Sequence, residues 1–184
     1  MPPTTVFQLT LLPGLLQTPE YRRWLIKTAD PTMSAVDVER RLEPTARRQH
    51  RLAYDSDFSL EALLSESALR HQVGGRGVMS EQLRNLANAG SQSNISIRVI
   101  PFGVGGHFGL IAQSFTLFEF PPLHLNRMPE PPVVFVEGFT GALFLEDEGV
   151  IERHRSAVEN LREVALSEND TGRLVQEIAE EYAA

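Results

Sequence analysis

Six short stretches rich in apolar residues predict the strands of a sheet. The clearest is 95–99, where three β-branched residues alternate with polar ones, the pattern of a half-buried strand. The same reasoning predicts strands over 6–12, 58–64, 95–99, 114–120, 133–136 and 142–145. The last two flank Gly138 and Gly141, and we expect them to form a hairpin.

Helices are predicted where capping residues precede apolar residues at helical spacing. Thr18 and Ser34 are typical capping residues, and they predict helices over about 18–29 and 34–54. Pro44 falls inside the second helix and is expected to kink or interrupt it, because proline cannot donate a backbone hydrogen bond. Further helices are expected over about 67–71, 78–90, 148–165 and 168–182, the last capped by Ser167.

This order of elements predicts one α+β domain spanning residues 1–184. We expect a mixed or mostly antiparallel sheet of five or six strands, covered by three or four helices. The two C-terminal helices are expected to pack on one face of this sheet. A stretch with five prolines, 121–132, is predicted to be an exposed loop.

Composition excludes several classes of function. The chain has no cysteine, so disulfides and thiolate chemistry are absent. No apolar run is long enough for a membrane span and no signal sequence is recognisable, so we predict a cytoplasmic protein that does not bind membranes. The net charge of −7 opposes direct binding to nucleic acid. The arginine-rich stretch 40–51 is interpreted as a solvated helix face, with phosphate or partner binding as the alternative.

Cofactor and metal sites are also not predicted. The glycine-rich segment 101–109 lacks the ending of a phosphate-binding loop and the spacing of a dinucleotide fingerprint. The five histidines show no metal-ligand spacing.

The order of several short motifs resembles one known family. The domain of unknown function that follows the helix-turn-helix in actinobacterial Xre-type transcriptional regulators carries similar motifs in the same order, over roughly residues 9–179. The motifs are Leu12-Pro13-Gly14-Leu15-Leu16-Gln17-Thr18-Pro19-Glu20-Tyr21, Arg47-Arg48-Gln49, Leu64-Ser65-Glu66-Ser67-Ala68-Leu69-Arg70, Val73-Gly74-Gly75, Val78-Met79 with Gln82-Leu83 and Leu86, Ile97-Arg98-Val99-Ile100-Pro101-Phe102, Gly106-His107, Phe135-Val136-Glu137, Leu143-Phe144-Leu145-Glu146-Asp147 and Ala165-Leu166-Ser167.

The resemblance implies a setting more than a mechanism. It implies ligand sensing or partner binding in an actinobacterium. One form of partner binding would be pairing with a second small protein. The helix-turn-helix of such regulators reads DNA with its second helix, and no such segment precedes Met1 in this sequence. We therefore expect a stand-alone copy of the effector domain that does not contact DNA directly.

The segment 101–109 is the first candidate site. Gly105 and Gly106 would let a ligand approach the backbone, while Phe102 and Phe108 would form apolar walls around His107. A histidine there could also act as a general base. The alternative is a hairpin whose glycines satisfy turn geometry, with the imidazole bonded to the backbone.

Two glutamates and three residues of other types complete the candidates. Glu137 ends an apolar strand after Phe135, so it is expected to be desolvated, with a raised pKa, unless it pairs with an arginine. Glu66 also follows an apolar strand, where it could be an acid–base group or, like Ser65, part of a helix cap. Tyr21 and Gln17 could line a pocket, with a core position as the alternative for the tyrosine.

Three functions remain open from the sequence. The first is a module that binds a small apolar metabolite or a partner protein, with 102–108 and 135–137 lining one pocket. The second is a recruited enzyme of secondary metabolism, a cofactor-independent cyclase or isomerase, with His107, Glu137 or Glu66 as acid–base groups. The third is the oligomerisation half of a truncated regulator, which would form a homodimer.

Overall fold

The strands of the protein pair into one mixed sheet. The computed structural model describes residues 3–55, 57–120 and 130–183. The strands are β1 (Thr4–Gln8), β2 (Leu60–Ser65), β3 (Ile95–Ile100), β4 (Phe115–Phe118), β5 (Val133–Gly138) and β6 (Gly141–Leu145). Their order in the sheet is β3-β2-β1-β4-β5-β6. The first three strands are parallel and the other pairings are antiparallel, so the predicted mixed sheet and the β5–β6 hairpin are confirmed.

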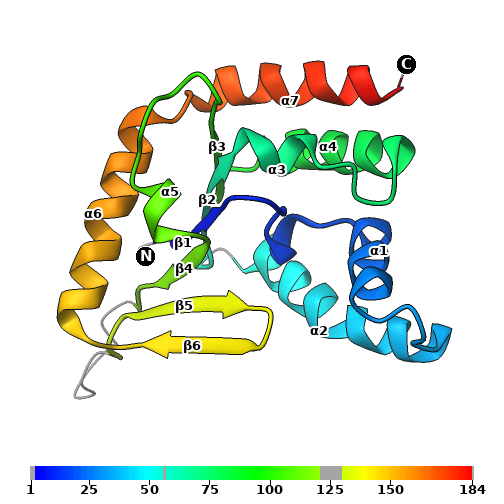
Figure 1. The fold of residues 1–184 in the computed structure, drawn as a ribbon, viewed down its shortest axis with the longest axis horizontal. Coiled ribbons are helices and arrows are strands. Elements are labelled where there is room, and N and C mark those ends of the chain that lie inside the picture. Colours follow the sequence, from blue (N-terminus) through cyan, green and yellow to red (C-terminus); the bar gives the residue numbers. More distant parts are fainter. Residues whose placement is uncertain (1–2, 56, 121–129, 184) are drawn as a thin grey trace.

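Helices are more numerous than the three or four expected, with seven α-helices in the described residues (Figure 1). They are α1 (Pro19–Ala29), α2 (Ala35–Tyr54), α3 (Glu66–Arg70), α4 (Arg76–Ala89), α5 (Gly109–Ala112), α6 (Glu148–Val164) and α7 (Glu168–Ala183), preceded by a 3-10 turn, η1 (Gly14–Leu16). Six of them match the helices predicted along the sequence, and the short helix α5 was not predicted. The predicted proline-rich loop lies mostly outside the described residues.

The predicted helix caps are confirmed. The hydroxyl of Thr18 accepts a hydrogen bond from the Tyr21 amide at 3.3 Å, which satisfies one of the free amides at the start of α1. The Ser34 hydroxyl accepts from the Asp37 amide at 3.1 Å, and the Ser167 hydroxyl accepts from the Asp170 amide at 3.1 Å.

Pro44 is expected to kink or interrupt α2, and of these two effects the interruption is wrong. The helix runs from Ala35 to Tyr54 through this residue. Proline removes one backbone hydrogen bond, to the carbonyl of Arg40, and both residues lie on the exposed side of the helix. Water can bond to that carbonyl, and the remaining bonds of this 20-residue helix keep it continuous.

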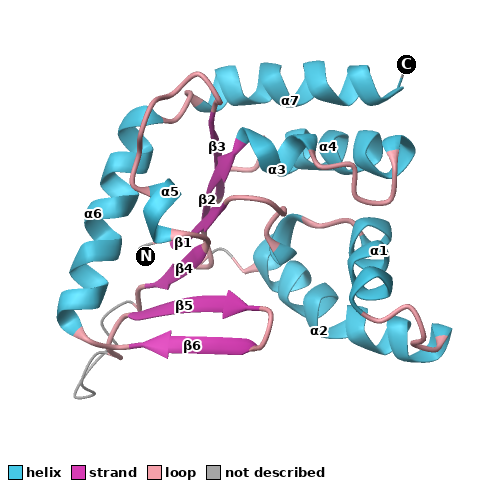
Figure 2. Ribbon diagram, in the orientation of Figure 1, coloured by secondary structure: helices cyan, strands magenta, loops and turns pink. Residues whose placement is uncertain are grey.

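Helices cover both faces of the sheet (Figure 2). One core contains Val6, Leu60 and Ile97 from the sheet, packed against α4 and α7. The other contains Phe7 and Leu63, which point to the opposite face and pack against α6. The expectation that both C-terminal helices share one face is therefore wrong, because α6 and α7 lie on opposite sides. We refer to these as the α7 face and the α6 face.

A charged residue lies inside this layered core. Strand β2 is buried on both faces, and Glu61 is 8% exposed. Two bonds from Arg162 of α6 reach its carboxylate, at 2.8 and 2.6 Å, and the Thr5 hydroxyl donates a third at 3.0 Å. This bidentate pair joins α6 to the middle of the sheet, and its hydrogen bonds raise the pKa of Arg162.

None of the helices in residues 3–55, 57–120 and 130–183 is both long and apolar enough to cross a membrane.

Loss of Arg162 should destabilise the protein, because it would leave the Glu61 carboxylate buried without its cation. We expect Arg162→Ala to lower the free energy of unfolding by about 2–4 kcal/mol, at the lower end if water reaches the half-exposed arginine site. Urea unfolding followed by circular dichroism measures this. Arg153→Ala, an exposed position on the same helix, should change it by less than about 0.5 kcal/mol. Equal losses in the two variants would contradict the buried pairing.

Candidate functional site

Side-chain amides hold the segment between β1 and α1 in place. Gln82 of α4 is fully buried; its amide accepts from the Thr18 backbone at 2.6 Å and donates to the Leu16 carbonyl at 2.8 Å. Gln49 of α2 donates to the carbonyls of Gly14 and Gln17 at 3.1 and 2.7 Å. This connecting segment, which contains only the short turn η1, is thus bonded to two different helices, so its backbone has a fixed position.

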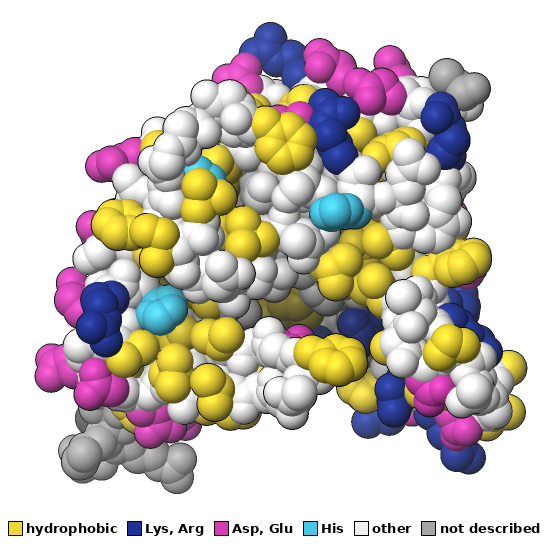
Figure 3. All heavy atoms as spheres, in the orientation of Figure 1, with side chains coloured by type: hydrophobic (Ala, Val, Ile, Leu, Met, Phe, Trp, Pro, Cys, Tyr) yellow, Lys and Arg dark blue, Asp and Glu magenta, His cyan; other side chains and the backbone are white. Residues whose placement is uncertain are grey.

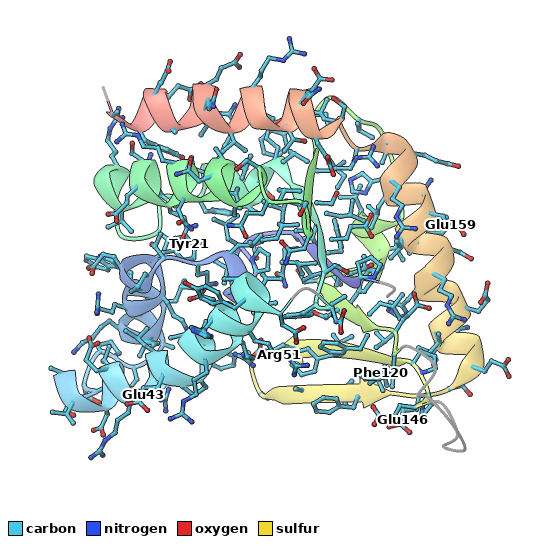
Figure 4. All side chains as sticks on the ribbon, turned by 180° about the vertical axis from the view of Figure 1, so that it is seen from behind. Tyr21, Glu43, Arg51, Phe120, Glu146 and Glu159 are labelled. Carbon is cyan, nitrogen blue, oxygen red and sulfur yellow. The ribbon has the colours of Figure 1, made fainter. Side chains whose placement is uncertain are left out.

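Tyr21 and Gln17 belong to the same bonding network. The Gln17 amide donates to the Leu12 carbonyl at 2.7 Å, and the Tyr21 hydroxyl accepts from the Leu12 amide at 3.3 Å. Tyr21 is fully buried beneath α4, and burial raises the pKa of its hydroxyl (Figure 4). Both residues therefore fix the segment that precedes α1, and the core position considered for Tyr21 is the one observed.

Arg22 extends this network to a group of charges. Its Nη1 donates to the Gln17 amide oxygen at 3.1 Å, whereas its buried Nε has no hydrogen-bond partner in the part of the chain that the structure describes. Burial lowers the pKa of Arg22, the positive charge of Arg48 lowers it further, and the negative charge of Glu137 opposes both effects. Three charged groups from α1, α2 and β5 thus lie close to one another.

A hollow opens beside these charges. In the space-filling view it lies between η1, β4 and the β5–β6 hairpin; its floor is hydrophobic, and acidic and basic side chains meet at its edge (Figure 3). Strand register places Phe135 and Phe144 on the same face as Val6, the α7 face, and their rings are 5.0 Å apart. We call this region the central hollow; Phe135 and Glu137 belong to the hairpin that borders it, and the charge of Glu137 acts on Arg22.

The glycine-rich segment lies on the other side of the sheet. A Cβ at Gly109 would be 2.3 Å from the Phe7 ring, which points to the α6 face, and the Phe108 amide donates to Asn160 of α6 at 3.1 Å. The hairpin interpretation of this segment is wrong, because β3 and β4 are not neighbours in the sheet. The segment instead connects β3, at the edge of the sheet, to β4 through α5. Of its glycines, only Gly109 lies so close to another side chain, that of Phe7, that a Cβ would not fit.

Other residues of this segment face solvent. Gly105 and Gly106 are exposed and have no atom within 4 Å of a Cβ, and the side chains of Phe102 and Phe108 are more than half exposed. The predicted apolar walls therefore do not enclose a site.

His107 is half-buried, and its environment favours the neutral ring. Its Nδ1 is buried without a hydrogen-bond partner among the described residues, so the alternative in which this atom bonds to the backbone gains no support. Burial lowers the pKa of His107, because the protonated ring would lose hydration. The histidine is suited to act as a base, but no described carboxylate bonds to it.

Glu66 is a structural group. It is 8% exposed; one carboxylate oxygen accepts from Arg70 at 2.6 Å and the other accepts from the Phe102 amide at 2.9 Å. The Ser65 hydroxyl caps α3, as considered from the sequence. Glu66 thus ties the end of β3 to α3, and both of its oxygens are occupied.

The environment of Glu137 differs from the one predicted. It is exposed, so the predicted desolvation is wrong; the strand leaves the covered part of the sheet before its last residues. No ion pair within hydrogen-bond distance involves it in residues 3–55, 57–120 and 130–183, although its charge acts on Arg22. Phe135, two residues earlier, is half-buried.

The structure does not bring the sequence candidates into one pocket. The sheet separates His107 from Phe135 and Glu137, and Glu66 is bonded at the end of β2. Sequence reasoning missed Arg22, which directly follows the Leu12–Tyr21 motif, and interpreted Arg48 as part of a solvated face, with phosphate or partner binding as the alternative. A signal was present: a motif this rich in amide-bonding residues predicts a fixed backbone, and the charge beside it is then held in place.

Two grooves lie elsewhere on the surface, and none of the predicted site residues lines them. One, of about 260 Å³, lies between α1 and the start of α2 beside Trp24. The other, of about 440 Å³, lies beside the start of β3, near Ser93 and Glu168. Among the described residues, no group of three histidine or carboxylate side chains is placed to hold a metal ion.

Residues 3–177 match the model of a family described as Domain of unknown function (DUF5753). Comparison with curated proteins and with solved structures gave no match.

The close approach at Gly109 predicts which glycine of the segment is required. Gly109→Ala should lower the free energy of unfolding by about 1–3 kcal/mol, because its methyl group would overlap the buried Phe7 ring. Gly103→Ala, where space is open, should change it by less than about 1 kcal/mol in either direction. Thermal unfolding of both variants tests this, and equal stability of the two would contradict the contact.

The lowered pKa of His107 predicts a pH dependence of stability. Between its lowered folded pKa and its unfolded value near 6.5, the unfolded chain binds more protons than the folded one. Stability should therefore fall as the pH falls through this range and be fully present above it. Urea unfolding of the wild type and His107→Gln at a series of pH values measures the difference. An unchanged slope in the variant would count against the assignment, as would a nuclear magnetic resonance titration giving a pKa above 6.5.

Proposed function

This chain belongs to the DUF5753 family of domains of unknown function, and we propose that it binds a small organic anion in the central hollow. The observation that carries the proposal is the buried Nε of Arg22, which has no partner among the described residues. We assign it to the hydrophobic hollow because Glu137, whose charge acts on Arg22, belongs to the hairpin that borders the hollow. The ligand would have an apolar body and a carboxylate, phosphate or similar group.

A buried hydrogen-bond donor without a partner is unfavourable, and an acceptor from a ligand would remove this cost. Leaving such a group unpaired costs about 1–3 kcal/mol, so native proteins usually satisfy it with protein, water or ligand. The guanidinium of Arg22 uses Nη1 to bond Gln17, which fixes its orientation, and a ligand oxygen would reach the buried Nε by displacing the side chains that cover it. Arginine binds carboxylate and phosphate with two parallel donors, and Arg48 supplies a second positive charge nearby.

The hydrophobic floor would hold the rest of the ligand. Binding sites for small molecules are mainly apolar, with a few polar groups that set orientation. The Phe135 and Phe144 rings provide aromatic surface on the face of the hairpin that carries Glu137. Glu137 is exposed, so it can balance the charge of Arg22 in the empty protein and turn toward solvent when an anion binds.

Binding without chemical change is the function that these observations favour. The acid–base candidates lie on different sides of the sheet, and an enzyme would need them within hydrogen-bond reach of one substrate. The setting that we propose is the one implied by motif order, an effector domain of the Xre-regulator type in an actinobacterial cytoplasm. The net charge of −7 is consistent with a role that does not involve direct contact with DNA.

Two fluorescent probes test the proposal. 8-Anilinonaphthalene-1-sulfonate carries an anion on an aromatic body, and N-phenyl-1-naphthylamine has the same body without the charge. We expect the sulfonate to bind the wild type and to bind Arg22→Gln about 10-fold more weakly, through loss of a charge-assisted hydrogen bond. The neutral probe should bind both proteins with similar, weaker affinity.

The matched control is Arg84→Gln, which changes an exposed arginine of α4 that is distant in sequence from Arg22 and Glu137. It should leave the affinity for the sulfonate unchanged. Equal affinity of the wild type and Arg22→Gln for the sulfonate would overturn the proposed role of Arg22. Equal weakening by both substitutions would mean that the probe responds to overall charge, which would also overturn it.

A further inference from the structure

The two edge strands of the sheet, β3 and β6, differ in how far other parts of the chain cover them. At the β3 edge, the Val99 carbonyl accepts from the Leu166 amide at 2.8 Å, and the Val99 amide donates to the Thr171 hydroxyl at 3.0 Å. Arg98 of the same strand donates to three carbonyls at the end of α6, those of Arg162, Ala165 and Leu166, at 2.7 to 3.0 Å. The junction between α6 and α7 therefore covers this edge and occupies its backbone groups.

Strand β6 forms the other edge and has no such cover among the described residues. Its residues Gly141–Leu145 contain neither a charge nor a proline, the features by which proteins usually protect an edge strand. Leu143 is 61% exposed and Phe144 is 67% exposed, and the hairpin tip adds the fully exposed Phe139. An apolar edge of this kind is typical of a strand that pairs with another chain.

Hairpin geometry identifies which backbone groups are available. Gly138 pairs with Gly141 around a two-residue loop, and a pair that closes such a loop is hydrogen-bonded. Because hydrogen-bonded and non-hydrogen-bonded pairs alternate, Ala142 and Phe144 direct their N–H and C=O groups outward. Two residues with free donors and acceptors, separated by Leu143, form a pattern that is complementary to itself.

We propose that two copies of this chain pair antiparallel through β6, with Leu143 of each copy at the two-fold axis. In this register Ala142 lies opposite Phe144 of the partner subunit, and the small side chain leaves room for the large ring beside it. Leu143 meets Leu143 of the partner subunit as a non-hydrogen-bonded pair, in which side chains are closest. The two sheets would become one continuous sheet.

Charge supports a second copy over an unrelated strand. With a net charge of −7, two copies repel each other, so any pairing surface must keep acidic groups apart. The paired residues carry no charge, and the acidic pair Glu146 and Asp147 would lie opposite Thr140 and Phe139 of the partner subunit. The proposed register therefore avoids like charges at every paired position. This pairing does not depend on the ligand role of the central hollow.

A charge swap at the two-fold axis tests the proposal with the full chain. We expect the wild type to sediment as a dimer at high micromolar concentration. Leu143→Lys and Leu143→Glu should each be monomeric, with dimerisation weakened on the order of 100-fold, because two like charges would face each other. An equal mixture of the two variants should recover the dimer, since opposite charges then meet at the axis.

The control is Ile111→Lys, an equally charged change at an exposed apolar position of α5. It should sediment as the wild type does, and circular dichroism should confirm that each variant is folded. A wild type that stays monomeric up to millimolar concentration would overturn the proposal, as would a Leu143→Lys variant that remains a dimer. A mixture of the Lys and Glu variants that stays monomeric would overturn the two-fold register.

Discussion

Burial of β2 on both faces is the constraint on which the rest of the structure depends. Residues 60–64 are all buried, so each face of the sheet needs its own layer of helices. On the α6 face this requires a helix to be held at the centre of the sheet, and the pair between Glu61 and Arg162 attaches it there. Glu43 and Glu159, in contrast, extend from the outer surfaces of their helices (Figure 4).

Features encoded by neighbouring residues could be predicted from the sequence. The caps at Thr18, Ser34 and Ser167 each depend on a residue three positions away, and all were correct. The strands, the hairpin and the mixed sheet followed from apolar patterning. The face on which α6 and α7 pack did not, because alternation describes one strand and says nothing about which helix covers which side. The interruption expected at Pro44 is wrong for a related reason: proline has a clear local cost, but the helix around it is long enough to tolerate it.

The candidate site shows the same limit. Residue types able to bind or react could be chosen from the sequence, yet their meeting depends on strand order and register. The sequence predicts one pocket for His107 and Glu137, whereas the β1–β4 and β4–β5 pairings place the sheet between them. Glu66 and Gln17 have the polarity of site residues but use it to bond nearby backbone. The motif before Arg22 indicates that its backbone is held in place, but the unpartnered nitrogen of its side chain is a property of packing that the sequence does not show.

The use of glutamine around residues 12–18 has a consequence for how the molecule responds to its surroundings. The amides of Gln17, Gln49 and Gln82 carry no net charge and do not titrate, so neither protonation nor added salt weakens their bonds appreciably. The charges of Arg22, Arg48 and Glu137 beside them are sensitive to ionic strength. The scaffold and the charges beside it thus respond separately, so the affinity that we propose for the hollow would vary with ionic conditions while the backbone around it stays in place.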